Sequence, residues 1–305
     1  MTKRKWGESF LKSGLPLEHL TAMTFKQLGW HGSAYPEYVR KNREGIETSF
    51  SLDFEVTSPF INKDTELSFL IECKYHDLAR FWFFLPHEST RWCFNDRVLN
   101  CGPCQTLAKP KEPSLLSLAP LTNEGIVVSI DGTKQENTLY SAKQQLAVGF
   151  LHICLGGMFS YNIDFENVKK PWSTALVPMV VTNARLFRLR PDVQSLDVIR
   201  NASSPEEIAD ELPWNWCYHN PSMPEYLENT RIIEQHKGQE AELLYRHPAV
   251  PERIRSFAQR PNWLAIVNIQ HLATVASAIS EQFLALPLVP TSVALKRSAT
   301  TKYGA

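Results

Sequence analysis

The sequence has no excess of charge of either sign, because 32 lysines and arginines balance 32 aspartates and glutamates over 305 residues. This balance excludes a basic coat over the whole surface, although a local basic patch is still allowed. Long apolar runs are also missing. The longest, residues 146–159, is interrupted by His152 and is shorter than the roughly 20 residues that span a bilayer. The polar start lacks the pattern of a signal peptide, so we expect a cytoplasmic protein with no membrane segment.

Cysteine is too scarce and scattered for a disulfide framework: there are six, and only Cys93, Cys101 and Cys104 cluster. Hydrophobic residues make up 43% and charged residues 21%, which excludes a disordered, collagen-like or coiled-coil chain. A chain of this size buries about three-quarters of its surface, so it needs no disulfide or metal merely to fold.

The spacing of apolar residues predicts a helix, three strands, a long helix and a β-rich segment, in the order 17–28, 46–57, 67–75, 81–85, 139–158 and 175–189. Prolines interrupt residues 86–138, which we interpret as an irregular insertion, and a further strand and helix follow at 263–283. This order is typical of an α/β or α+β fold with a central mixed sheet flanked by helices. We expect a core over residues 1–190 and a mixed C-terminal region over 191–305 that packs on the core or extends it.

Three charged residues stand out on two of the predicted strands. In residues 46–57, alternation places Leu52 and Phe54 on one face and Asp53 on the other. In residues 67–75, Glu72 and Lys74 are two positions apart and therefore share a face. Charges inside an apolar strand are unfavourable unless they are paired or bind a metal, so we expect the three to converge.

The first predicted helix contributes a further carboxylate. Helical spacing puts Leu15, Glu18, Ala22 and Phe25 on one stripe, so Glu18 is predicted to face the core. Several carboxylates around one point favour a hard cation such as Mg²⁺, with Mn²⁺ as a substitute. A lysine beside them can orient or deprotonate water.

These residues resemble the PD-(D/E)xK, or restriction-endonuclease-like, nucleases, whose αβββαβ core carries a helical Glu, then Asp, then Glu-x-Lys. The matching segments are Gly14 to Glu18, Leu52-Asp53, Glu72-Cys73-Lys74 and the β-rich residues 174–189. The resemblance implies that Asp53, Glu72 and the Cys73 carbonyl hold Mg²⁺, that Lys74 positions the attacking water, and that Glu18 completes the metal site.

The pattern departs from the family in two places. Leu52 replaces the proline that names the motif, and residues 86–138 separate the third predicted strand from the long helix. A fourth, helical residue of the family could match Lys143, Gln144 or Gln145, and the sequence does not choose among them. Other neighbours have simpler interpretations: Glu55 is a rival ligand or a solvated carboxylate, and His76 and Asp77 cap a strand end.

The resemblance implies a Mg²⁺-dependent nuclease that hydrolyses phosphodiester bonds, most simply as an endonuclease acting on DNA, with RNA as an open alternative. A second hypothesis is a module with the nuclease fold that binds nucleic acid or a protein partner with little or no cleavage. A neutral protein could also hold DNA as a homodimer.

Two weaker signals concern metal and nucleic acid. Cys101-Gly102-Pro103-Cys104 copies a redox tetrapeptide, but nearby prolines exclude the long helix that such chemistry needs; a zinc site is the alternative, with the ligands Cys93, Cys101, Cys104 and His87. Basic residues could follow a phosphate backbone, namely Lys3, Arg4, Lys5, Arg40, Lys41 and Arg43. Trp214 and Trp216 are interpreted as core anchors.

Overall fold

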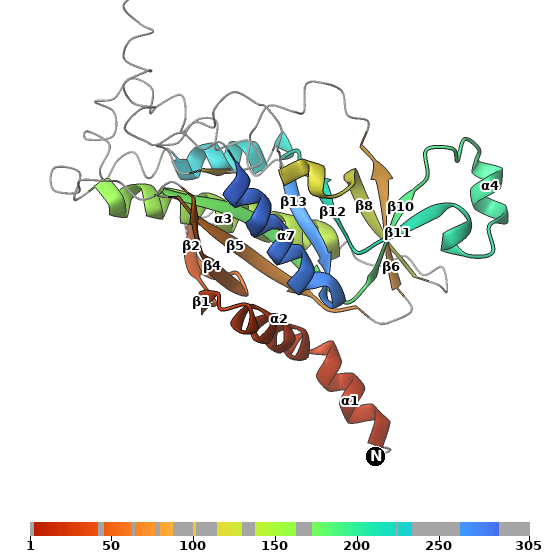
Figure 1. Ribbon diagram of the computed structural model, residues 1–305, viewed down its shortest axis with the longest axis horizontal. Coiled ribbons are helices and arrows are strands. Elements are labelled where there is room, and N and C mark those ends of the chain that lie inside the picture. Colours follow the sequence, from red (N-terminus) through yellow and green to blue (C-terminus); the bar gives the residue numbers. More distant parts are fainter. Residues whose placement is uncertain are drawn as a thin grey trace, which may run out of the picture.

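The computed structural model describes residues 3–41, 46–62, 65–76, 80–87, 100–101, 115–129, 138–162, 173–223, 225–233 and 263–286. They form one large mixed sheet with helices on both faces, and a separate two-stranded sheet (Figure 1). The predicted α/β class with a central mixed sheet is therefore confirmed. Among the described residues, none of the helices is long and apolar enough to cross a membrane.

The large sheet has eleven strands, of which β7 (Asn100–Cys101) pairs only with the start of β9. The other ten lie in the order β1 (His31–Ala34), β4 (Phe54–Asn62), β5 (Thr65–Lys74), β9 (Ser173–Thr182), β13 (Trp263–Asn268), β12 (Trp214–Tyr218), β8 (Leu121–Ser129), β6 (Arg80–Pro86), β10 (Arg185–Leu189) and β11 (Ala209–Leu212). The central strands β5, β9 and β13 run parallel, and both of their faces are buried. Strands of this kind are near-continuously apolar, as the run Phe69-Leu70-Ile71 is in β5.

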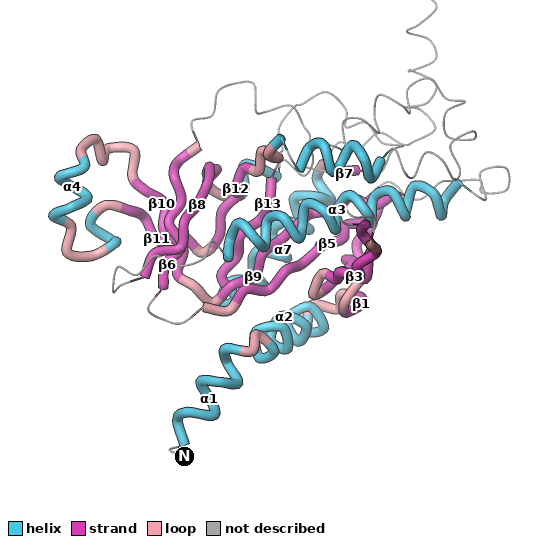
Figure 2. The backbone as a smooth tube through the Cα atoms, turned by 180° about the vertical axis from the view of Figure 1, so that it is seen from behind, coloured by secondary structure: helices cyan, strands magenta, loops and turns pink. Residues whose placement is uncertain are grey.

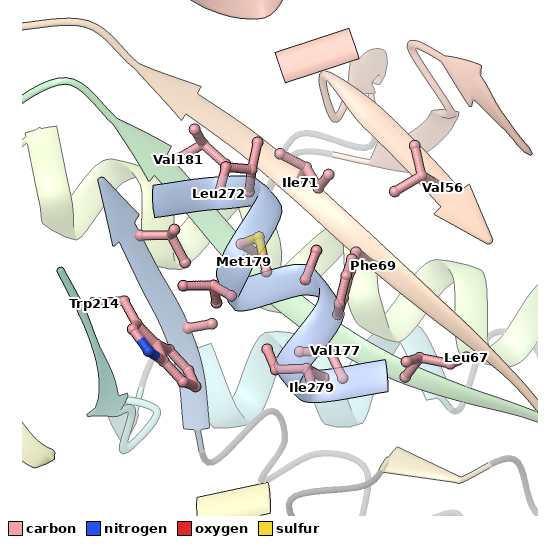
Figure 3. Close-up of a cluster of buried hydrophobic side chains, with 14 of the residues drawn as sticks. Val56, Leu67, Phe69, Ile71, Val177, Met179, Val181, Trp214, Leu272 and Ile279 are labelled. Carbon is pink, nitrogen blue, oxygen red and sulfur yellow. The ribbon is translucent and has the colours of Figure 1, made fainter. Parts of the chain in front are cut away.

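One face of these strands is covered by α2 (Leu15–Gln27) and α7 (Leu272–Ala285). Figure 3 shows α7 lying across β5, β9 and β13, with Leu272 beside Ile71 and Val181 and Ile279 beside Val177. Asn62 fixes the end of α7, because its side-chain amide donates to the carbonyls of Phe283 and Leu286 at 2.6 and 3.1 Å. This cap satisfies carbonyls that a helix end leaves without partners.

The opposite face is covered by α3 (Thr138–Asn162) and by the helical residues 225–233. Leu146 and Phe150 of α3 pack in one cluster with Leu70 of β5 and Val180 of β9. The helix runs four residues beyond the predicted end at 158 and so continues through Gly156 and Gly157. Views from the front and back agree that α3 and α7 lie on opposite sides of the sheet (Figures 1 and 2).

The elements that surround the charged residues are neighbours in space but not all consecutive in the chain. After α2, strands β1, β4 and β5 pair antiparallel in the order β1–β4–β5, with a separate pair of strands (residues 37–51) between β1 and β4. The chain then passes through β6, β7 and β8 before it reaches α3 and β9, which pairs parallel with β5. The carboxyl ends of β1, β5 and β9 therefore meet at one end of the sheet, where β4 begins. Loops at such an end commonly carry functional side chains.

The predicted strand at 46–57 was wrong in one respect, because it is two strands. Residues 47–51 form β3 (Glu47–Ser51), which pairs with β2 (Glu37–Lys41) in a separate two-stranded sheet, and β4 starts at Phe54. The break reverses the side chains: Leu52 packs in the cluster beneath α3, whereas Phe54 packs with α2 and α7. Leu52 and Phe54 thus do not share the face that simple alternation assigned to them.

The predicted third strand at 81–85 exists as β6, but it lies between β8 and β10 rather than beside β5. Its expected place in the meander is taken by β1, a four-residue strand with no apolar alternation to reveal it. Residues 121–129, within the predicted insertion, form the full sheet strand β8.

The C-terminal region contributes to the same sheet. Strands β11, β12 and β13 all pair within it, and Trp214 and Trp216 are buried in the cluster beneath α7, as anticipated. The remaining short elements are α1 (Lys3–Lys12), α4 (Leu196–Asn201), η2 (Leu115–Leu118), η3 (Pro205–Glu207) and η4 (Ile269–His271).

Candidate active site

Asp53 and the end of β5 are held together by two hydrogen bonds. The backbone N–H of Asp53 donates to the Ile71 carbonyl at 3.1 Å, which continues the β4–β5 ladder by one residue. The Asp53 carboxylate then takes the place of the next backbone partner, because its Oδ2 accepts from the Cys73 N–H at 2.6 Å. The residue at the break between β3 and β4 is therefore fixed beside Glu72-Cys73-Lys74.

Glu72 and Lys74 form the second part of the site. They project from β5 on the side of α3, as their spacing predicts, and Lys74 Nζ lies 2.6 Å from Glu72 Oε1. The same ammonium donates to Gln145 Oε1 of α3 at 2.9 Å. Within the described residues, these two bonds use two of the three N–H donors of Lys74, so one is left for a ligand.

Cys73 separates these two side chains and points to the other face. Its thiol donates to Thr21 Oγ1 of α2 at 3.6 Å, and burial, with the charge of Asp53, holds the pKa of the thiol well above its usual value. A thiol with this pKa is a poor nucleophile. Since the N–H and C=O of a strand residue point to the same side, the Cys73 carbonyl faces the edge where Asp53 lies.

Glu18 reaches the site from the first turn of α2. The buried stripe of this helix is formed by Leu17, Thr21 and Phe25, so the predicted stripe through Leu15 and Glu18 was wrong. Glu18 follows Leu17 by one residue, so it lies at the flank of the buried stripe and is half-buried.

The carboxylate of Glu18 accepts a hydrogen bond from the Tyr35 hydroxyl, with Oε2 at 3.0 Å. Tyr35 lies in the turn after β1, and its hydrogen bond to Glu18, together with the negative charge of Glu18, raises the pKa of the phenol. Gly14, the N-cap residue of α2, has φ 84°, and an added Cβ there would lie 3.5 Å from Glu18 Oε1.

Burial and neighbouring negative charge raise the pKa of two carboxylates at this end of β5. Burial raises the pKa of Glu72 to about 7, and the charges of Asp53 and Glu18 add to this, although Lys74 opposes it. Burial also raises the pKa of Asp53 against the Cys73 hydrogen bond, with the charge of Glu18 adding to the rise. A bound cation would stabilise the ionised form of such acids and so relieve their raised pKa.

One oxygen of Glu72 has no partner in the part of the chain that the structure describes. Glu72 is 3% exposed, and while Oε1 is paired with Lys74, the buried Oε2 accepts no hydrogen bond from any described residue. A buried carboxylate oxygen without a partner is costly, and a cation or a bound water would relieve it. The donor set is all oxygen, which suits Mg²⁺ or Mn²⁺.

The described residues form no group of three His, Cys, Asp or Glu side chains that could hold a metal ion. Two carboxylates, Asp53 and Glu72, therefore define the site, while Glu18 is bound to Tyr35. Mg²⁺ typically keeps several waters and binds through one or two carboxylates, so this donor set still fits it.

Among the three accessory candidates on α3, only Gln145 contacts the charged residues. Gln144 donates to the Tyr140 hydroxyl at 2.8 Å on the exposed side of the helix. Lys143 is buried and lies 3.5 Å from the Tyr218 carbonyl of β12. The three positions thus diverge around the helix, and the geometry selects Gln145.

His76 and its neighbours hold the end of β5 in place. The His76 N–H donates to Asn183 Oδ1 at 2.7 Å, and Asn183 Nδ2 donates back to the His76 carbonyl at 2.6 Å. The His76 ring lies 2.9 Å from the Thr138 hydroxyl at the start of α3. His76 therefore ends the strand, as predicted, and links β5 to α3 and β9. Asp77 lies outside the described residues.

The other predicted residues are not brought to this site by the described part of the chain. Glu55 is half-buried on β4, where burial raises its pKa. Arg40 and Lys41 lie in β2, and Lys3, Arg4 and Lys5 in α1, but their side chains are outside the description, as is Arg43 altogether.

The predicted zinc site is only partly visible. His87 packs its ring against Tyr218 and Trp263, with centroids 5.5 and 5.2 Å away, and burial lowers its pKa. The backbone of Cys101 lies in β7, while Cys93 and Cys104 are outside the described residues.

Tyr35 is the residue of the site that sequence reasoning missed. It lies in a short segment, Gly32 to Pro36, without apolar periodicity or a recognisable motif. Only the approach of β1 to β4 brings it near Glu18 and Asp53, and that pairing is long-range in sequence. No family model, curated protein or solved structure matches this chain.

Proposed function

We propose that this protein is a Mg²⁺-dependent nuclease of the PD-(D/E)xK type that acts on DNA as an endonuclease. The observation that carries the proposal is the meeting of Asp53 with Glu72-Cys73-Lys74, through the 2.6 Å bond from the Cys73 N–H to Asp53 Oδ2 and the 2.6 Å Lys74–Glu72 pair. The order of α2, β1, β4, β5, α3 and β9 along the chain supports it, because this order is the αβββαβ order of the family once the intervening strands β2, β3, β6, β7 and β8 are set aside.

In this proposal Asp53, Glu72 and the Cys73 carbonyl hold Mg²⁺ directly. Glu18 completes the site as an outer partner, through a metal-bound water, because the described residues do not bring the three acids into one close group. The unpaired Oε2 of Glu72 and the raised pKa values of Glu72 and Asp53 support this ligand set. A bound Mg²⁺ supplies charge stabilisation at a phosphoryl oxygen and lowers the pKa of water.

The chain's own groups do the positioning. Lys74 is held by Glu72 and Gln145, so its remaining N–H donor is fixed in direction and can bind a phosphate oxygen or the attacking water. Gln145 thereby acts on Lys74 from α3. The β2–β3 arm carries Arg40 and Lys41 in its first strand and returns to the large sheet beside Asp53, so in this proposal it supplies contacts with a phosphate backbone.

A second candidate is a module that binds nucleic acid or a protein partner without cutting it. One observation favours it: the described residues bring only two carboxylates together directly, and Lys74 is already engaged by Glu72. The presence of the acids, with Lys74 and Gln145 in contact, favours the nuclease over the binding module.

The experiment that separates the two is a substrate panel. The full chain is incubated with plasmid, linear duplex, single-stranded DNA and RNA in Mg²⁺ or Mn²⁺, beside Asp53→Ala. The nuclease proposal expects cleavage of at least one substrate by the wild type and none by the variant. Binding of a substrate without cleavage by either protein would favour the binding module, and equal cleavage by both would refute the assignment of the site.

A further inference from the structure

Tyr35 has a backbone conformation that its residue type rarely adopts. Its φ is 56°, and it is the one residue other than glycine with a positive φ in the described part of the chain. A left-handed backbone is unfavourable for a residue with a bulky side chain. Pro36 follows it, and a residue before proline also prefers an extended backbone. The surrounding structure must therefore impose this conformation.

The break between β3 and β4 imposes it. The Tyr35 N–H donates to the Asp53 carbonyl at 3.0 Å, and the Leu52 N–H donates to the Pro36 carbonyl at 3.2 Å. The Tyr35 ring lies against Phe54, with centroids 6.5 Å apart. Tyr35 is thus tied to Asp53, and the next residue, Pro36, to Leu52, so the turn is fixed to the segment that leads into the candidate site.

The strain does not serve to bury the side chain, because Tyr35 is 51% exposed. Its result is the position of the hydroxyl, which donates to Glu18 Oε2 at 3.0 Å. An exposed hydrogen bond of this kind contributes little to folding, since water can replace it. Strained residues with little structural benefit cluster at functional sites, where they orient other groups.

We propose that Tyr35 is a positioning residue whose hydroxyl holds the Glu18 carboxylate toward Asp53 and Glu72. Glu18 is the acid of the site that comes from outside the sheet, on a helix that contacts β5 through other side chains, so it needs a separate restraint. Removing a group that orients a metal ligand lowers metal affinity, as removing the ligand itself does. The inference rests on the proposed function, because it takes Glu18 as a member of the metal site.

The test is Mn²⁺ binding to the full chain by calorimetry, which needs no substrate. The proteins are wild type, Tyr35→Phe, Glu18→Ala and the double variant, with Tyr226→Phe as the control at another exposed tyrosine. Phenylalanine keeps the ring and the backbone conformation and removes only the hydroxyl. We expect Tyr35→Phe to weaken Mn²⁺ binding about tenfold, and Tyr226→Phe to leave it unchanged.

The double variant separates positioning from a structural role. If Tyr35 acts through Glu18, Tyr35→Phe causes no further loss of affinity in the Glu18→Ala protein. An equal further loss in that background, or unchanged affinity of Tyr35→Phe, would overturn the inference and leave the nuclease proposal standing. If Tyr35→Phe does not fold, the Glu18→Ala protein tests the inference by itself. Wild-type Mn²⁺ affinity of Glu18→Ala would show that Glu18 is not part of the metal site, so Tyr35 would have no ligand to position. Absence of Mn²⁺ binding by the wild type would overturn both proposals.

Discussion

Two ion-pair clusters of this protein have the same N–O distance and opposite effects on their acids. Lys74 Nζ lies 2.6 Å from Glu72 Oε1, and Arg185 Nη2 lies 2.6 Å from both Glu206 Oε1 and Glu211 Oε2. Beside Arg185, hydrogen bonding from the guanidinium lowers the pKa of Glu211. Beside Lys74, the pKa of Glu72 is nevertheless raised to about 7, because burial outweighs the lysine.

The difference is one of solvent. The side chain of Glu72 is 4% exposed, whereas that of Glu211 is 46% exposed. In the exposed cluster, water solvates whatever charge the pairing leaves over, so the cluster is a surface feature between β10, η3 and β11. In the buried cluster, the attraction between Lys74 and Glu72 does not offset the free energy lost when the carboxylate is removed from water. The ion pair therefore does not stabilise the fold. Such groups indicate a functional site.

The largest expected difference between the two clusters is in cleavage. Lys74→Ala should lower the single-turnover rate in Mg²⁺ at least about a thousandfold, on the order of 4 kcal/mol, because it removes a preorganised charge at the phosphate. Arg185→Ala, the matched control, should cleave at the wild-type rate. Similar rates for the two variants would show that the buried cluster has no special role in cleavage.

The pH dependence of stability should also differ, in the protein without metal. The pKa of Glu72 is raised from 4.5 to about 7 on folding, so the folded state binds the proton more tightly. Stability is then unaffected below about pH 4.5 and is lost as pH rises to about 7, on the order of 3 kcal/mol in full.

Denaturant unfolding of wild type and Glu72→Gln at several pH values measures this contribution. Glutamine cannot ionise, so the variant should gain stability relative to wild type as pH rises through this window. A difference that stays constant with pH would argue against the raised pKa of Glu72.

Metal should reverse this loss. In the proposed site, Mg²⁺ or Mn²⁺ would bind the folded, deprotonated form and so add about 2.7 kcal/mol at a hundredfold excess over Kd. We expect either ion to raise the melting temperature more at pH 8 than at pH 5, and to have no such effect on Glu72→Ala. Equal shifts in wild type and Glu72→Ala would place the metal elsewhere.

The smallest effect is expected at the exposed cluster. Arg185→Ala should lower the free energy of unfolding by about 1 kcal/mol or less, because solvent screens exposed pairs. Part of this loss comes from packing, since the guanidinium lies 4.8 Å from the Phe187 ring centroid. Unfolding in low and high salt separates the two parts, since only the ionic part is screened. A loss of several kcal/mol would contradict the comparison.

The parts of the site that could be predicted from the sequence are those set by local periodicity. Glu72 and Lys74 share a face because they lie two residues apart in a strand that is apolar on both sides of them. The α2 helix begins and ends close to its predicted positions, since Gly14 and Gly29 bound it with positive φ. Core strands and helices of this kind have a strong pattern.

The parts that could not be predicted depend on contacts distant in the sequence. Alternation continues through Leu52, so nothing local shows that the chain leaves one sheet there and enters another at Phe54. The place of β6 is set by its pairing with β8 and β10, and that of Tyr35 by the β1–β4 ladder. The choice of Gln145 over Gln144 depends on how α3 is rotated against β5.

The most direct test of the account is to locate a bound cation. Crystals of the full chain grown with Mn²⁺ should give an anomalous difference peak beside the carboxylates of Asp53 and Glu72 and the Cys73 carbonyl. The Glu72→Ala protein under the same conditions should give no peak there. A wild-type structure with Glu72 Oε2 still unpaired and Mn²⁺ absent from this end of β5 would contradict the central claim.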